Sequence, residues 1–151
     1  MSADLRELYQ SVILDHNRCP RNFGELEGAN RSAEGFNPLC GDQITVYLSV
    51  EDGVVRDVGF KGSGCAISTA SASLMTQGIK GKKIEDVELL FDRFRNLVTS
   101  DPTARGGGEE LGKLSVFSGV REFPMRVKCA TLAWHAMREA LHETSGTATT
   151  E

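Results

Sequence analysis

The sequence predicts an α+β domain in which helices cover one face of a small antiparallel sheet. Two patterns carry this prediction: a run of alternating apolar residues at 43–61, and helical apolar periodicity before and after it. Consecutive strands followed by consecutive helices are typical of α+β folds. Because 151 residues suffice for one hydrophobic core but hardly for two, we expect a single domain over residues 1–151.

The N-terminal segment has the spacing of an amphipathic helix, which we expect to end before Pro20. Its apolar face consists of Leu5, Leu8, Val12 and Ile13. Residues 22–38 are rich in Gly, Asn and Glu, and we expect them to be mostly loop.

A hairpin is predicted next. Residues 43–50 alternate apolar and polar side chains, which indicates a strand with one buried face. Asp52 and Gly53 form a hairpin turn signal, so residues 54–61 are expected to return as the second strand. The glycines at 62 and 64 then end the sheet pattern.

Three further helices are expected, at residues 65–77, 84–98 and 127–142, because each stretch has an apolar or small-residue face at helical spacing. Residues 100–123 are expected to form an insertion loop, since residues 100–110 contain a proline and three consecutive glycines and no apolar period. Residues 144–151 are expected to be a flexible tail.

Charge and composition narrow the classes of function. The net charge is −4 and no basic stripe is present, which argues against a nucleic-acid binder. The longest uncharged run, residues 62–79, contains too many hydroxyl and amide side chains to span a membrane. Residues 1–10 carry charges instead of a signal-peptide core, so we expect a cytoplasmic protein. Thiols stay reduced in that compartment. The four cysteines of this protein are therefore expected to be metal ligands or reactive groups and not to form disulfides.

Three cysteines lie at the expected ends of elements. Cys40 precedes the first strand, Cys65 begins a helix, and Cys129 is near the start of the last helix. Asp42 follows Cys40 by two residues, and Gly41 between them lets the backbone bend so that both side chains face one point. Three thiolates and a carboxylate would satisfy tetrahedral zinc.

Spacing alone leaves another interpretation open. The separations of 25 and 64 residues between these cysteines match no common zinc pattern. Cysteine is also a common small residue of protein cores.

Three segments around these cysteines resemble the signature segments of the NifU/IscU iron–sulfur assembly family. They are residues 37–42 (NPLCGD), 62–68 (GSGCAIS) and 126–130 (RVKCA), and residues 8–16 match as well. The resemblance implies a SufE/NifU-like α+β fold with the cysteines clustered at one tip. It also implies a role in iron–sulfur cluster assembly, in which sulfur comes from a pyridoxal-phosphate cysteine desulfurase.

Two departures resemble the SufU branch of this family, whose members are zinc-dependent sulfurtransferases. Lys128 stands where scaffolds of the family carry His, and the stretch at 100–123 is longer than scaffolds need. The branch implies zinc held by Cys40, Asp42, Cys65 and Cys129. It implies Cys40 as the sulfur acceptor, which a His of the desulfurase would release from zinc.

The implied partners are a SufS-type desulfurase and a downstream iron–sulfur scaffold. Arg126 is expected either to contact the partner or to be a solvated helix start, and Lys128 either to neutralise the site or to face water. The alternative function is a scaffold that assembles and transfers an iron–sulfur cluster, and a structural zinc module is a third.

The remaining candidates are expected to lie outside the site. We expect Cys19 to be an incidental thiol and His16 to be a cation at the end of its helix. His135 and His142 are expected on the surface, and Trp134 in the core or in an interface.

Overall fold

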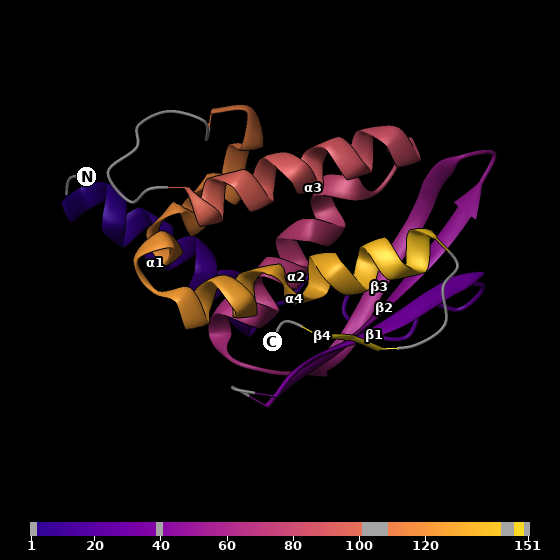
Figure 1. Ribbon diagram of the computed structural model, residues 1–151, viewed down its shortest axis with the longest axis horizontal. Coiled ribbons are helices and arrows are strands. Elements are labelled where there is room, and N and C mark those ends of the chain that lie inside the picture. Colours follow the sequence, from indigo (N-terminus) through magenta and orange to yellow (C-terminus); the bar gives the residue numbers. More distant parts are fainter. Residues whose placement is uncertain (1–2, 39–40, 101–108, 143–146, 150–151) are drawn as a thin grey trace.

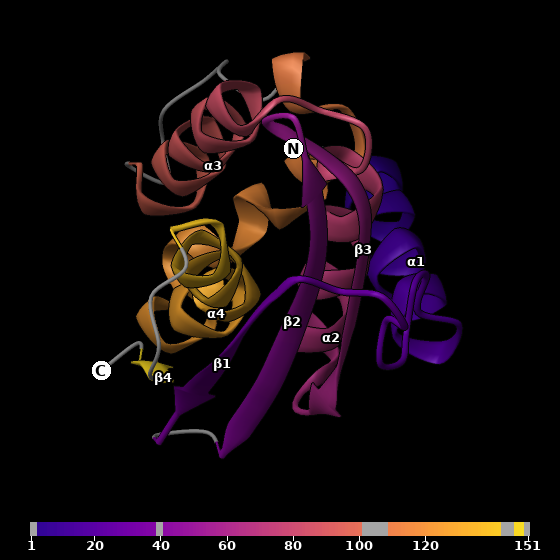
Figure 2. The same ribbon diagram turned by 90° about the vertical axis from the view of Figure 1, so that its right-hand side faces the viewer.

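The computed structural model describes residues 3–38, 41–100, 109–142 and 147–149. Its elements are α1 (Ala3–Arg18), β1 (Arg31–Asn37), β2 (Asp42–Glu51), β3 (Val54–Ser63), α2 (Ala66–Ile79), α3 (Ile84–Thr99), the 3₁₀ segment η1 (Glu109–Glu122), α4 (Pro124–Leu141) and β4 (Thr147–Thr149). The helices lie on one face of the sheet, with α4 against β1 and β2 and α2 against β3 (Figures 1 and 2). The predicted fold class is confirmed.

The sheet is built around the predicted hairpin. Its strand order is β3-β2-β1-β4, in which β2 pairs antiparallel with both β1 and β3. Alternate residues of β2 are buried beneath the helices, as the period-two pattern predicted. Asp52 and Gly53 both have positive φ, of 55° and 74°, which is the backbone of the tight hairpin turn their sequence indicated.

The core extends from the inner face of the sheet through α2 and α4 to α3 and η1. Trp134 of α4 is fully buried, as predicted, with its ring stacked at 4.7 Å on Phe94 and 5.7 Å on Phe91, both of α3. Gly35 of β1 allows α4 to approach closely, because a Cβ at that position would lie 3.0 Å from Leu132 Cδ1 and 3.2 Å from the Leu132 carbonyl oxygen.

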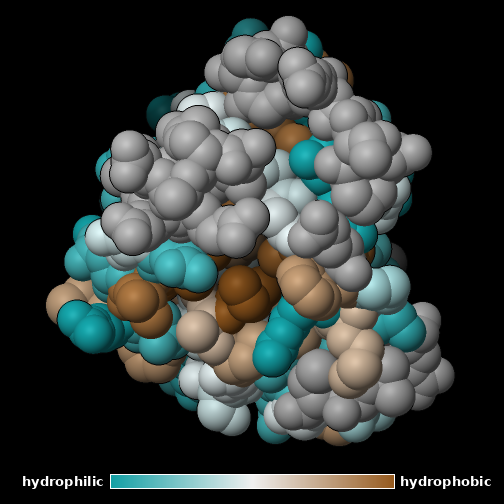
Figure 3. Space-filling view, turned by 90° about the vertical axis from the view of Figure 1, so that its left-hand side faces the viewer, coloured by the Kyte–Doolittle hydropathy of each residue, from teal (hydrophilic) through white to brown (hydrophobic). Residues whose placement is uncertain are grey.

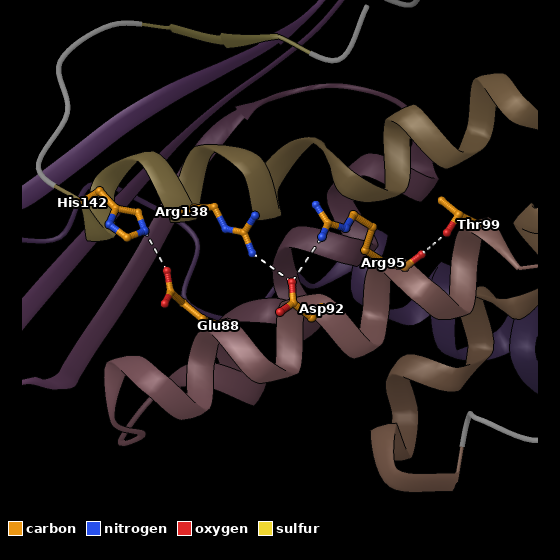
Figure 4. A network of polar contacts seen from close by, with 6 residues as sticks. All are labelled: Glu88, Asp92, Arg95, Thr99, Arg138 and His142. Carbon is orange, nitrogen blue, oxygen red and sulfur yellow. Dashed lines mark hydrogen bonds and ion pairs between the residues drawn. The ribbon is translucent and has the colours of Figure 1, made fainter.

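A polar network joins the outer faces of α3 and α4. Asp92 accepts hydrogen bonds from Arg138 at 3.1 Å and from Arg95 at 3.3 Å, and His142 lies 2.7 Å from Glu88 (Figure 4). The Arg138 guanidinium also covers the Phe91 ring, 4.3 Å from its centroid. These contacts lie near the C-terminal end of α4 and tie it to α3.

Three expectations about irregular segments were wrong. Part of the expected loop 22–38 is strand β1, and Thr147–Thr149 of the expected tail pairs in parallel with β1. Residues 109–122 of the expected insertion loop are helical, because an apolar set folds back onto the core. Its members are Leu111, Leu114, Val116, Phe117 and Val120. Residues 101–108, 144–146 and 150–151 lie outside the described residues.

Two histidines also differ from expectation. His16 is 2% exposed and its Nδ1 lies 2.7 Å from Ser73 Oγ, so it is a buried partner of α2 and not a cationic cap. Burial lowers its pKa. His135 is half-buried against the edge of Phe91, and burial lowers its pKa as well, whereas His142 is exposed as expected. None of the helices in the described segments is both long enough and apolar enough to cross a bilayer.

Candidate metal centre

The structure brings together three of the four residues that the sequence analysis assigned to a metal site. Asp42 begins β2, Cys65 is the N-cap of α2, and Cys129 lies in the second turn of α4. One carboxylate oxygen and the two sulfur atoms lie within 4.8 Å of one another. Cys40, the fourth, lies outside the described residues.

Glycines shape the backbone around this cluster. Gly41 has a φ of 73°, the bend predicted for it, and its N–H donates a hydrogen bond to the Asn37 carbonyl at 2.8 Å. A Cβ at Gly62 would lie only 2.0 Å from the Gln43 carbonyl oxygen, so β3 can approach the start of β2 only with glycine there. This close pairing carries the chain directly into Cys65, beside Asp42.

Asp42 is buried at 1% exposure, and its two carboxylate oxygens have different surroundings. Oδ1 accepts a hydrogen bond from the Cys65 backbone N–H at 2.9 Å, while Oδ2 has no hydrogen-bond partner within the described part of the chain. Buried polar atoms are normally satisfied, and an exception points to a missing ion or water. An unsatisfied oxygen on a carboxylate that lies close to two sulfur atoms therefore fits a cation ligand.

The two cysteines differ in accessibility. Cys129 is fully buried, with Asn37 Nδ2 3.9 Å from its sulfur, whereas Cys65 is half-buried at the start of α2. Two thiols and a carboxylate match the donor types that zinc prefers, and they leave one tetrahedral position for a further ligand. Cys19 is exposed and does not belong to this cluster.

Arg126 lies beside the cluster, in the first turn of α4, with an exposed side chain. The pKa of Arg126 is raised, mainly because its guanidinium is attracted to Cys65. Desolvation lowers this pKa, and a hydrogen bond with Cys129 raises it further. The guanidinium group is thus a positive charge placed against two potential thiolates. Arg126 was expected either to contact a partner or to be a solvated helix start, and neither expectation included its position beside the sulfur atoms.

Large apolar side chains are exposed at the start of α4, beside Arg126, and on α1. Phe123, the N-cap of α4, and Met125 in its first turn are 57% and 53% exposed, and Leu14 of α1 is 46% exposed. On the side of the molecule where α1 and the start of α4 lie, several hydrophobic residues gather near the middle of the face, with hydrophilic residues beside them (Figure 3). Surfaces that combine aromatic, methionine and arginine side chains are typical of protein interfaces.

One further residue near the cluster was not considered as a candidate from the sequence. Ser68, in the first turn of α2, is buried next to Asp42. The signal was its position in the segment GSGCAIS, three residues after Cys65.

The fold and the cluster together define a small α+β protein with a buried thiol–carboxylate centre where the sheet meets two helices. The NifU-like N terminal domain matches residues 8–130. The chain belongs to the NifU-like N terminal domain family.

Relatives across nearly the whole length carry two kinds of name. The iron–sulfur cluster assembly scaffold protein IscU of Thermotoga maritima is 41% identical, with 91% of this chain and 95% of that protein covered. The zinc-dependent sulfurtransferase SufU of Bacillus subtilis is 39% identical, with 96% and 97% covered. The crystal structure of FiSufU from Fervidobacterium islandicum AW-1 superposes with a TM-score of 0.81 at 32% identity, covering 90% of this chain and 98% of that one.

Proposed function

We propose that this protein is a zinc-dependent sulfur acceptor that takes persulfide sulfur from a SufS-type cysteine desulfurase and passes it to a downstream iron–sulfur scaffold in the cytoplasm. The observation that carries the proposal is the cluster of Asp42, Cys65 and Cys129, in which Asp42 Oδ2 has no hydrogen-bond partner among the described residues. The similarity to a zinc-dependent sulfurtransferase over 96% of the chain supports it.

In this proposal Cys40, Asp42, Cys65 and Cys129 hold the metal, within one NifU/IscU-like domain over residues 1–151. Bound zinc would keep the thiols deprotonated while tempering their reactivity. Asp42 and Cys129 are 1% and 0% exposed, which shields them from a partner and suits them to a holding role. Cys40 is the acceptor that the family resemblance implies, and covalent connectivity keeps it two residues from Asp42.

The transfer step is a thiol–persulfide exchange. The Cys40 thiolate attacks the terminal sulfur of the desulfurase persulfide, and a new S–S bond forms on Cys40. The bond between that sulfur and the desulfurase cysteine breaks, and its electron pair leaves with the desulfurase thiolate. One persulfide replaces another, so no external oxidant or reductant is needed.

Arg126 is proposed to contact the desulfurase. Its exposed guanidinium lies beside Cys65 and Cys129 and is flanked by the exposed Met125 and Phe123. A cation with apolar neighbours at the rim of the centre suits the docking of an enzyme that must deliver a persulfide there.

The proposal is tested by adding the protein to its desulfurase and measuring alanine formation from cysteine. We expect stimulation by the wild-type chain, none by Cys40→Ser, and full stimulation by the control Cys19→Ser, because a thiolate and not a hydroxyl is the nucleophile. Zinc content, measured on the same samples, is expected to be close to one per wild-type chain. A zinc-loaded wild-type protein that leaves turnover unchanged would indicate a structural zinc module.

A scaffold that carries an iron–sulfur cluster is the second candidate, favoured by relatives named IscU at 38% and 41% identity. Anaerobic reconstitution separates the two. A stable cluster at one per chain that transfers to an apo-acceptor would support the scaffold, whereas Lys128 in place of the family's histidine leads us to expect none.

A further inference from the structure

Ser68 is a buried serine whose hydroxyl is unsatisfied. Its side chain is 0% exposed, and its Oγ has no hydrogen-bond partner among the described residues. A buried hydroxyl without a partner costs free energy in the folded state. Its position beside the metal centre suggests what would satisfy it.

Gly64 connects Ser68 to the centre. A Cβ built on Gly64 would lie 2.8 Å from Asp42 Oδ1 and 3.1 Å from Ser68 Oγ. The serine hydroxyl and the carboxylate therefore border the same space, which glycine leaves open. Oδ1 already accepts one hydrogen bond, from the Cys65 N–H, and a carboxylate oxygen can accept a second.

The lack of a partner is specific to Ser68. Ser71, one turn further along α2 and also 0% exposed, donates to the Ala130 carbonyl at 2.5 Å and accepts from Trp134 Nε1 at 3.1 Å. The two serines have the same chemistry, helix and burial. Of these two, only Ser68, next to the metal centre, has a hydroxyl without a hydrogen-bond partner among the described residues.

We propose that Ser68 is a positioning residue of the metal centre: in the loaded protein its hydroxyl donates a hydrogen bond to Asp42 Oδ1, which orients Oδ2 toward the metal. Both groups end short side chains, so rotation about χ1 of Ser68 or χ2 of Asp42 changes the separation of the oxygens. Hydrogen bonds from neighbouring residues to a ligating carboxylate commonly change metal affinity by about 10- to 100-fold. The inference rests on the proposed zinc site and adds a residue to it.

The proposal predicts opposite effects of Ser68→Ala on the metal-free and metal-loaded protein. Alanine removes an unsatisfied hydroxyl from the metal-free protein, whose melting temperature should be unchanged or higher. The same change removes a donor from the loaded centre, so the zinc Kd should rise about tenfold.

The experiment uses the full chain after zinc has been removed by chelation. The zinc Kd is measured by competition with a chromophoric chelator, and melting temperatures are measured with and without zinc. Ser71→Ala is the matched control: it should lower the metal-free melting temperature, because it breaks two buried hydrogen bonds, and leave the zinc Kd unchanged.

Three results would overturn the proposal, and they can be told apart. A zinc Kd for Ser68→Ala equal to that of the wild type removes the role of Ser68 while the zinc site stands. A fall in metal-free melting temperature like that of Ser71→Ala makes the hydroxyl a structural one. A wild-type chain that binds no zinc overturns both this inference and the proposed function.

Discussion

The first turn of α2 and the turns that follow it bury the same kinds of side chain in different ways. Beyond the first turn, Ser71, Ser73 and Thr76 are all fully buried and all hydrogen-bonded. Ser73 Oγ accepts from the Arg21 N–H at 2.8 Å, and Thr76 donates to the Ser73 carbonyl at 2.6 Å. In the first turn, Ser68 has no such partner.

The difference distinguishes buried polar groups that stabilise the fold through hydrogen bonds within the protein from buried polar groups that a bound metal would satisfy. Buried polar atoms that pair with each other rigidify a core. Ser68 Oγ and Asp42 Oδ2 both lack a hydrogen-bond partner among the described residues, and both side chains border Gly64, where β3 leads into α2. We therefore expect changes in the two regions of α2 to be separable: one set alters stability without zinc, and the other alters the response to zinc.

The largest effect on stability is expected from Trp134→Ala. Trp134 is fully buried against Phe91 and Phe94 and donates to Ser71, so its truncation should lower the free energy of unfolding by about 3–5 kcal/mol. Urea denaturation of the zinc-free protein measures it. The control Trp134→Phe keeps most of the ring and should cost less. A zinc Kd that weakens in parallel would break the separation of the two regions.

Zinc removal should have the next largest effect. A ligand that binds only the folded chain stabilises it by about 2.7 kcal/mol when its free concentration is a hundred times its Kd. Chelation should therefore lower the melting temperature of the wild-type protein. Cys65→Ser and Cys129→Ser, which each remove a sulfur ligand, should contain less zinc and respond less to chelator. An unchanged wild-type melt would contradict a contribution of the metal to stability.

The strands and helices with strong periodicity were predictable from sequence, while β1, η1 and β4 were not. The inward positions of β1 are Ala33, Gly35 and Asn37, which have no apolar alternation. They are small or polar because α4 approaches at Gly35 and the metal centre lies beyond Asn37. Tertiary packing, and not strand propensity, creates this strand.

The helical segment η1 was missed for a different reason. Four of its five buried apolar residues, Leu111, Leu114, Phe117 and Val120, recur every three positions, which is the period of a 3₁₀ helix and not that of an α-helix; Val116 is the fifth. Gly112, with φ 57° and ψ −127°, interrupts the helical backbone near its start. A search for the 3.6-residue period alone passes over such a segment.

The metal centre was predictable to a different extent. Asp42, Cys65 and Cys129 stand at the ends of expected elements, but spacing alone left buried core cysteines as an alternative. The resemblance of their segments to the NifU/IscU family implied that they meet, and the structure brings them together. The position of Ser68 in the segment GSGCAIS was visible in the sequence, but its proposed role was not, because that role rests on a hydroxyl without a partner among the described residues. Only the arrangement of neighbouring groups reveals that.

Acidification is expected to have a smaller effect on the free energy of unfolding. His16 is buried against Ser73, and burial, followed by the charge of Arg21, lowers its pKa below the ordinary 6.5; Asp15 opposes this and Lys113 adds to it. As the pH falls below 6.5, the imidazole of His16 is protonated in the unfolded chain before it is protonated in the folded one. Its contribution to the free energy of unfolding is therefore fully present above pH 6.5 and is lost as the pH falls toward the folded-state pKa.

Urea denaturation of the zinc-free protein at about pH 7.5 and about pH 5.5 measures this decline, in the range where histidine is the side chain that ordinarily titrates. His135 should add to it, since burial lowers its pKa too. His16→Gln should reduce the decline. A protein that is equally stable at both pH values would count against the buried, neutral His16.

The smallest effect is expected on the outer face of α3 and α4. His142 and Glu88 lie 2.7 Å apart, but the histidine is 53% exposed, so Glu88→Gln should change the free energy of unfolding by less than about 1 kcal/mol. Zinc affinity should not change. A loss of unfolding free energy as large as that of Trp134→Ala would show that this exposed network contributes far more to stability than expected.

The most direct test of the account is to locate the accepted sulfur. The zinc-loaded protein is incubated with its desulfurase and cysteine, alkylated, digested and analysed by mass spectrometry. The account predicts a mass increase of one sulfur on the peptide that contains Cys40, and none on that of Cys19. Sulfur on the Cys19 peptide, or on no peptide of a chain that stimulates the desulfurase, would contradict it.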